Sequence, residues 1–171
     1  RTLRGAIDWS YRLLDGEEQR LFARLGVFNG AFSLPAAAAI GQDTAATPDA
    51  EPPLAFIDRL ASLVDKSMVR MAGEVDGQPR FRLLVVLRDY AKERLAARGE
   101  AEATATRHLT YYLAAAERAA PFLEGRQATE WLPSLSADRE EFRAALAFGL
   151  ARPALAQRFA QAGQRQPQPE V

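Results

Sequence analysis

The sequence predicts a mainly α-helical protein that contains one β-hairpin, and two observations lead to this class. Apolar residues recur at helical spacing through most of residues 3–150. Two short runs in the middle of the chain, 68–71 and 80–83, instead alternate apolar and arginine side chains, as the strands of a hairpin do. Glycines, prolines and capping residues separate these segments, so each element can be assigned in order.

The first helix is predicted from Leu3 to Leu14, and its apolar face is widened by Trp9. We expect Trp9 to pack inside the fold. Asp15 follows as the candidate N-cap of a second helix, and Glu18 stands three residues later. This spacing is a capping-box pattern, in which each side chain accepts a hydrogen bond from the backbone amide of the other residue.

A third helix is expected at 34–40, after a short connection. The second helix is predicted to end near Gly26, and Val27–Phe28 to form a short extended piece. Ser33 is the candidate N-cap of the third helix. Residues 42–53 contain three prolines and no apolar periodicity, so they are predicted to form a surface loop.

A fourth helix at 54–64 leads directly into the hairpin. The residues between the strands predict a connecting loop of about six to eight residues, because turn formers recur there. These turn formers are Gly73, Asp76, Gly77 and Pro79. Alternation gives the hairpin one apolar face and one basic face. The apolar face carries Val69, Met71, Phe81 and Leu83, and the basic face carries Arg70, Arg80 and Arg82.

The helical pattern continues beyond the hairpin. One helix from residue 84 is predicted to end at Gly99, and another spans 102–120. A short helix carries Trp131, and the last begins after Asp138. Glu141 lies three residues beyond Asp138, which makes this pair a second capping-box candidate.

The order of these elements predicts the architecture. Helices followed by a two-stranded hairpin are the winged-helix arrangement, in which 54–64 takes the place of the recognition helix and the hairpin is the wing. We therefore expect a winged-helix domain at 1–98 and an all-α, repeat-like helical domain at 99–150. Residues 151–171 are rich in Gln and Pro and are predicted to be a disordered tail.

Composition argues against catalysis. The 171 residues carry 22 basic and 22 acidic side chains, no Cys and a single histidine, His108. Thiolate metal sites are thereby excluded, and a zinc site or catalytic triad is not expected. The phosphate-binding pattern GxxxxGK[ST] does not occur. We expect His108 to be an ordinary surface or half-buried residue, and the chain to be no enzyme and to hold no metal or cofactor of its own.

Two acidic pairs are assigned to helix capping rather than to a catalytic dyad. Glu17–Glu18 and Glu140–Glu141 each fall in a predicted first helical turn. The macrodipole of a helix favours acidic side chains at that end. These positions therefore have a structural explanation.

Candidate nucleic-acid contacts are few, and their setting is unfavourable. They are the basic side chains of the fourth helix, its end and the hairpin: Arg59, Lys66, Arg70, Arg80 and Arg82. Asp58 and Asp65 accompany Arg59 on the helix, whereas base reading needs a basic helix in the groove. The hairpin arginines could equally protect a sheet edge and pair with Glu74 or Asp76. Docking on protein is therefore the preferred hypothesis, and direct DNA binding the weaker one.

Most of the chain resembles a known family. The most specific runs are IDWSY at 7–11 and LVDKS at 63–67. They lie in segments 1–34, 56–70 and 80–95, which resemble the winged-helix segment after the ATPase core of bacterial STAND-type regulators. That group includes large LuxR-type and SARP-type transcriptional regulators. Residues 107–150 are similar to the helical region that leads into their tetratricopeptide-like repeats.

The resemblance implies a partner domain. In such proteins a nucleotide-binding domain, absent from these 171 residues, holds ATP or ADP and packs against the winged helix, which relays its state to the repeats. In the related NB-ARC proteins a Met-His-Asp motif after the wing touches the nucleotide. The matching positions here are Leu83, Leu84 and Val85, so that contact is not carried over.

Three functions remain open from the sequence. The first is a non-catalytic regulatory module of an ATPase-type transcriptional regulator, which predicts an exposed apolar patch for docking. The alternative is a direct DNA-binding winged helix-turn-helix domain, which predicts a basic surface along 54–82. The third is a scaffold that binds protein partners through 99–150. A cytoplasmic location is expected, because no stretch approaches the roughly 20 apolar residues of a membrane span.

Overall fold

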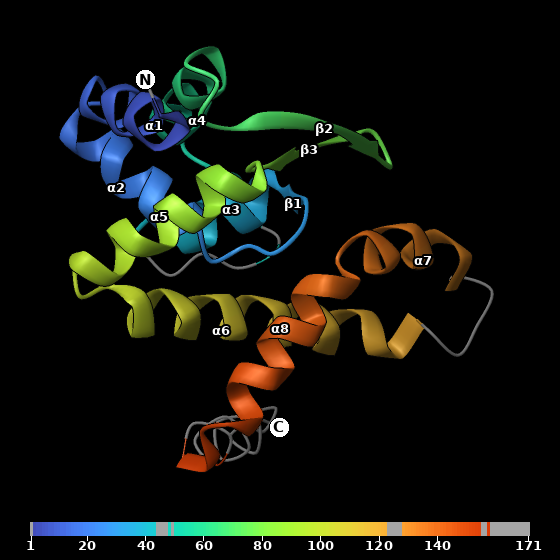
Figure 1. Ribbon diagram of the computed structural model, residues 1–171. Helices are drawn as coiled ribbons and strands as arrows, with labels where there is room; N and C mark the ends of the chain where they lie inside the picture. Colours follow the sequence, from blue (N-terminus) through green and yellow to red (C-terminus); the bar gives the residue numbers. More distant parts are fainter. Residues whose placement is uncertain (1, 44–47, 49, 123–127, 155–156, 158–171) are drawn as a thin grey trace.

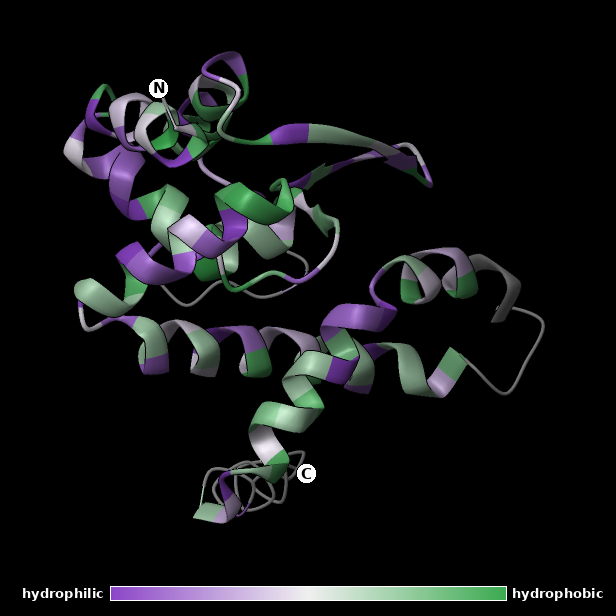
Figure 2. Cartoon of the chain, viewed as in Figure 1, coloured by the Kyte–Doolittle hydropathy of each residue, from purple (hydrophilic) through white to green (hydrophobic). Residues whose placement is uncertain are grey.

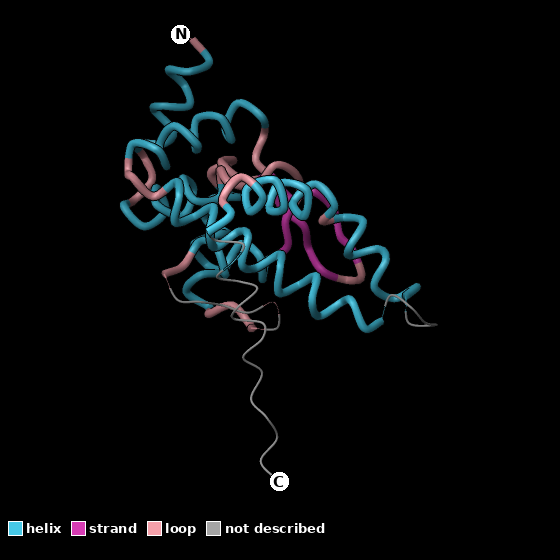
Figure 3. Tube along the Cα trace, turned by 90° about the horizontal axis from the view of Figure 1, so that it is seen from below, coloured by secondary structure: helices cyan, strands magenta, loops and turns pink. Residues whose placement is uncertain are grey.

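The computed structural model describes residues 2–43, 48, 50–122, 128–154 and 157. Helices make up most of this part, and the hairpin extends away from them above α7 (Figure 1). Figure 3 shows the same arrangement from below, with the strands gathered in one small sheet. Most of the predicted disordered tail and part of the predicted loop at 42–53 lie outside the described residues. Within the described part, no helix combines the length and apolarity needed to cross a membrane.

Local capping signals begin the first two helices. Helix α1 spans Leu3–Arg12 and helix α2 spans Gly16–Leu25. The Asp15 side chain accepts from the Glu18 amide at 2.8 Å, and the Glu18 side chain accepts from the Asp15 amide at 2.8 Å. The capping box predicted from the spacing is therefore confirmed.

The segment after α2 differs from the expectation. The amides of Val27 and Phe28 donate to the carbonyls of Arg24 and Leu25, so the chain there continues as tight turns and not as an extended piece. The strand β1 comes later, at Phe32–Ser33, and Ser33 caps helix α3, Leu34–Gly41, as predicted. The Phe28 ring turns inward and stacks on Phe32 with centroids 4.2 Å apart, because burial of both rings outweighs a strand at 27–28.

The two strands of the wing form, with β1, a three-stranded antiparallel sheet in the order β1-β3-β2. Helix α4, Leu54–Asp65, precedes strands β2, Arg70–Val75, and β3, Gln78–Arg82. The predicted six- to eight-residue loop is wrong, because the strands pair up to a two-residue turn at Asp76–Gly77. Both turn residues have positive φ, 52° and 73°, as tight hairpin turns require. Gly73, at φ 98°, lies where the strand register shifts between Met71 and Glu74.

The remaining chain is helical. Helices α5, Val85–Ala97, and α6, Ala101–Ala119, follow the wing, and a short 3₁₀ turn covers Ala120–Phe122. Helices α7, Ala128–Ala137, and α8, Arg139–Leu150, complete the described fold. Helix α6 runs beneath the winged helix and α8 crosses it (Figure 1). The mainly α fold with a winged helix, predicted from element order, is confirmed.

One hydrophobic core joins the winged helix to the helices that follow. Helix α3 is buried from Ala36 to Ile40, because α2 packs on one side of it and α6 on the other. Alanine side chains allow this close approach on both sides. Tyr112 of α6 is fully buried in the same cluster as Phe22 of α2. The division at residues 98 and 99 remains a prediction, although the two segments share this core.

Trp9 does not lie in the core, and its expected burial is wrong. The side chain is 65% exposed, whereas Tyr11 and Leu14 of the same segment are buried. A step of two residues turns a helix by roughly 200°, so the helix face that buries Tyr11 directs Trp9 to the opposite side. Leu13, four residues after Trp9 and just beyond the end of α1, is also exposed.

Replacing Trp9 with alanine should therefore leave the free energy of unfolding within about 0.5 kcal/mol of wild type, because an exposed side chain loses few contacts. Replacing the fully buried Phe22 should cost about 3–5 kcal/mol. Urea unfolding of both variants measures the difference. A loss above about 2 kcal/mol for Trp9→Ala would show that the indole is packed in solution.

Candidate nucleic-acid interface

The recognition-position helix α4 presents an acidic and apolar surface. Phe56, Leu60 and Leu63 are buried and attach the helix to the core. The residues left exposed along it are Leu54, Ala55, Asp58, Ala61 and Asp65. This surface carries no basic side chain, so it lacks the donors that read guanine and the charge that attracts phosphate.

Both basic candidates of this region are engaged within the protein. Arg59 is half-buried, with a guanidinium nitrogen 3.8 Å from a Glu17 carboxylate oxygen. The Lys66 ammonium donates to both oxygens of Glu18, at 2.5 and 2.7 Å. The structure thus places Arg59 and Lys66 in contacts between α4 and α2.

Glu18 joins the start of α2 to the end of α4. Besides Lys66, its carboxylate accepts from Ser62 Oγ at 2.5 Å and from the Asp15 amide. Burial alone would raise the pKa of Glu18, but the bonds from Lys66, Ser62 and the Asp15 amide outweigh it and hold the pKa below its usual value. This carboxylate therefore fixes the position of α4 while it remains ionised.

The three hairpin arginines do not form one basic face. Arg70 and Arg82 are opposite each other in the strand register, and both are exposed. Among the described residues, no carboxylate lies within ion-pair distance of either. Arg80 is buried instead, because the start of α8 covers its part of the sheet. It donates to the Ala31 carbonyl at 3.1 Å and forms an ion pair with Asp138.

The predicted apolar face of the hairpin is also only partly buried. Val69, Phe81 and Leu83 lie in the core, but Met71 is 58% exposed. Met71 lies on β2, and the hairpin extends away from the helical body (Figure 1). Glu74 and Asp76 do not pair with the wing arginines in the described structure, and Asp76 accepts a bond from Ser134 of α7 at 2.9 Å.

A buried carboxylate links the winged helix to the last helix, and the sequence reasoning missed it. Glu141 Oε1 accepts from the amides of Asn29 and Gly30 at 2.8 and 2.6 Å, and its Oε2 lies 2.8 Å from His108 Nε2. The second capping-box prediction is therefore wrong, because Asp138 and Glu141 both serve contacts to other elements. The expected exposure of His108 is also wrong, since it is 3% exposed.

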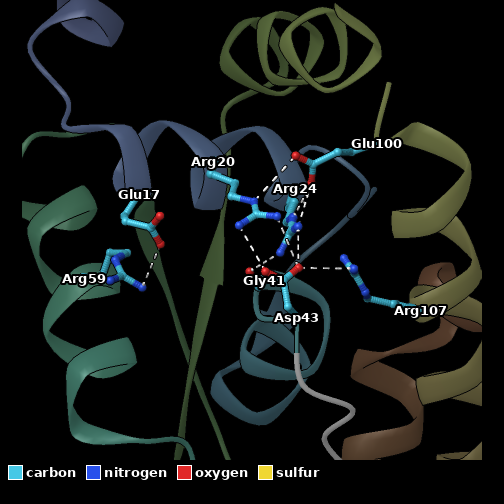
Figure 4. Close-up of polar contacts among 8 residues, drawn as sticks. All are labelled: Glu17, Arg20, Arg24, Gly41, Asp43, Arg59, Glu100 and Arg107. Atoms are coloured by element: carbon cyan, nitrogen blue, oxygen red, sulfur yellow. Dashed lines mark hydrogen bonds and ion pairs between the residues drawn. The ribbon is translucent and has the colours of Figure 1, made fainter. Parts of the chain in front are cut away.

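Arg24 forms a second buried link, shown in Figure 4. Its guanidinium donates to Glu100 at 2.7 Å, to the Gly41 carbonyl at 3.0 Å and to Asp43 at 2.8 Å. Arg107 of α6 approaches the same Asp43 carboxylate at 3.4 Å. These bonds tie α2, the end of α3 and the start of α6 together. No local sequence pattern signals them, because the partners are distant in the chain.

The structure and a family comparison agree on the class of this segment. Residues 14–96 match the family model described as a winged helix-turn-helix domain. The matched range begins just before α2, includes the whole sheet and ends within α5. The order of helices and strands over residues 14–96 is consistent with this match.

Curated relatives come from mycobacteria. A protein of Mycobacterium bovis named "Putative HTH-type transcriptional regulator" is 47% identical over 115 residues, which are 67% of this chain and 12% of the relative. A protein of Mycobacterium tuberculosis with the same description matches equally. An uncharacterised protein of Mycobacterium bovis is 38% identical over 107 residues, 63% of this chain and 26% of that protein. No solved structure gave a significant match.

The chain thus spans about an eighth of the length of the first relatives, as the 12% coverage shows. The winged-helix part of the resemblance inferred from sequence is confirmed. Its STAND, LuxR-type and SARP-type details, and the similarity of 107–150 to tetratricopeptide-like repeats, remain predictions.

Acid should weaken the contribution of Glu18 to stability. Its pKa is lower in the folded than in the unfolded protein, so its stabilising effect is present above its ordinary pKa of 4.5 and is lost as the pH falls through the folded value. The difference in unfolding free energy between wild type and Glu18→Gln should be largest near pH 7 and narrow below about pH 4.5. Glu17→Gln, one residue away, is the control, and a gap independent of pH would contradict this role.

Removing Arg24 should destabilise the fold strongly. Arg24→Met leaves Glu100 and Asp43 without their central partner and should cost about 3–5 kcal/mol of unfolding free energy. Arg20→Met is the matched control, because Arg20 meets the same two carboxylates from a more exposed position, where pairs contribute about 0–1 kcal/mol. Equal losses in chemical denaturation for the two variants would disprove a special role for the buried guanidinium.

Proposed function

We propose that this segment is a non-enzymatic winged helix-turn-helix module of a transcriptional regulator that contacts DNA through its wing. The family match and the names of the mycobacterial relatives support a DNA-linked regulatory role. The family match and these names support direct DNA binding better than docking on an ATPase domain, because neither of them mentions an ATPase. The observation that carries the proposal is the pair of exposed arginines on the wing.

Arg70 and Arg82 are suited to bind phosphate. They face each other across β2 and β3, and residues directly opposite on paired strands project to the same side of a sheet. Two unpaired guanidiniums so placed repel each other, and a phosphate between them would remove that repulsion. Phosphate contacts orient a protein on DNA but carry no sequence information.

Base reading by α4 does not follow from this geometry. Asp58 and Asp65 lie on its exposed surface, and Lys66 is held by Glu18. We therefore expect weak, sequence-independent binding by this segment alone. Selection of a DNA site would then depend on other parts of a longer protein.

A fluorescence-anisotropy titration with random duplex at low salt tests this function. We expect a dissociation constant of roughly 10⁻⁴–10⁻⁶ M, with a slope of log affinity against log salt of about −1.8 for two phosphate contacts. The double variant Arg70→Ala with Arg82→Ala should abolish the binding. Binding that is unchanged in this variant would refute the wing contact.

The control is a second double variant of equal net charge. Lys92 and Arg98 are exposed on and just after α5, outside the wing. Their replacement by alanine should leave the affinity within about twofold, because the contact depends on position and not on total charge. An equal loss in both double variants would mean that only net charge matters.

Docking on protein remains the second candidate because apolar side chains are exposed beside the hairpin. Met71, Leu84 and Val85 are exposed, and the hollow of about 520 Å³ beside them is lined by Val64, Ser67, Val69, Arg70, Met71 and Leu84. Exposed apolar clusters of this kind mark interaction sites. A nucleotide-binding domain is the partner that the family resemblance implies. A GxxxxGK[ST] motif in frame upstream would support that partner, and a full-length protein without one would exclude it.

The third hypothesis, a scaffold that binds protein partners, is supported only by an apolar surface on α8. Leu146 and Leu150 are exposed on α8, and a hollow of about 500 Å³ lies beside Leu135, Phe142 and Leu146. This surface could hold an apolar segment of a partner. It does not distinguish such a partner from further helices of a longer chain.

A further inference from the structure

We propose that a cavity between the wing and the helical unit binds a small aromatic carboxylic acid. The cavity has a volume of about 220 Å³. Its walls come from β2 and β3, the start of α3, and helices α6, α7 and α8. Pockets enclosed by several elements, with apolar walls and a few polar groups, are the usual form of small-molecule sites.

The walls suit a flat apolar body. Tyr111 and Ala115 of α6, Trp131 of α7 and Phe142 of α8 line the cavity, together with Val75 of β2. Rings in such walls hold a ligand ring by stacking or by edge contacts. The volume limits the occupant to about one substituted aromatic ring.

The ring of Trp131 is held in place by its neighbours. Phe122 stacks on it with centroids 5.3 Å apart and planes 5° from parallel. The Arg118 guanidinium lies 5.6 Å from the centre of the same ring. A wall fixed in this way loses little side-chain freedom when a ligand binds.

Arg80 provides the polar end of the site. Within the described structure its hydrogen bonds to Ala31 and Asp138 both use Nη2, and its buried Nε has no hydrogen-bond partner there. A carboxylate is the acceptor that a guanidinium binds best. The Asp138 carboxylate is already paired with Arg80, which disfavours its use as the partner of an amine ligand.

An occupant of this cavity would connect the wing to α7. The present link between them is the bond from Ser134 Oγ to Asp76 at 2.9 Å near the tip of the hairpin. A ligand held between Val75 and Trp131 would add a second contact to the same pair of elements. Its binding should therefore stabilise the folded chain as well as occupy the site.

Fluorine NMR of 4-fluorobenzoate with the full chain tests the proposal. We expect saturable line broadening with a dissociation constant of about 1 mM or tighter, in the range of a ligand of this size. The neutral 4-fluorobenzyl alcohol should bind at least about tenfold more weakly, because it lacks the charge that Arg80 favours. No saturable binding of 4-fluorobenzoate below about 10 mM would overturn the proposal.

Matched variants locate the site. Ala115→Phe fills the cavity from α6 and should weaken binding at least about tenfold, whereas Ala103→Phe places the same ring at an exposed position of the same helix and should change nothing. Arg80→Lys keeps the pair with Asp138 but removes the guanidinium fork, and should weaken binding by about tenfold. Equal affinities of the two phenylalanine variants would show that the probe binds elsewhere and would refute this site.

Discussion

The buried carboxylate of Glu141 is the polar contact that fixes α8 against the winged helix. It accepts hydrogen bonds from the backbone amides of Asn29 and Gly30 and forms another with His108 of α6. These amides would otherwise lack partners beneath α8, and buried N–H groups without acceptors are costly. Because α8 is fixed by this contact, its N-cap residue Asp138 lies beside the sheet, pairs with the buried Arg80 and lines the cavity together with it.

Ion pairs inside the protein also explain why few basic side chains are available around the recognition-position helix α4. The chain has as many acidic as basic side chains, and the structure uses several of the basic ones internally. Lys66 forms an ion pair with Glu18, Arg80 with Asp138, and Arg24 with Glu100. What remains exposed on the wing is the pair Arg70 and Arg82. The proposed contact with a DNA backbone depends on this pair, because α4 lacks the groups that read bases.

Sequence reasoning succeeded where a signal and its partner lie within one turn of helix. The capping box of Asp15 and Glu18 and the cap at Ser33 are of this kind, as is the alternation that marks the hairpin. The same spacing at Asp138 and Glu141 led to a wrong prediction of a capping box, because both carboxylates bind partners far away in the sequence. The prediction for Trp9 was wrong for a related reason: apolar side chains occur on opposite sides of this helix, and their spacing does not show which side is covered.

The sequence by itself determined the order and type of the elements, and with them the winged helix, because hydrophobic period, caps and turn residues act locally. It also determined which side chains could contact nucleic acid. Only the tertiary structure decided which of these remain available: Arg70 and Arg82 are exposed, whereas Arg80, Lys66 and Arg59 are engaged. The reason is physical. A buried or half-buried charge requires a partner, and that partner is supplied by an element whose position no local pattern encodes.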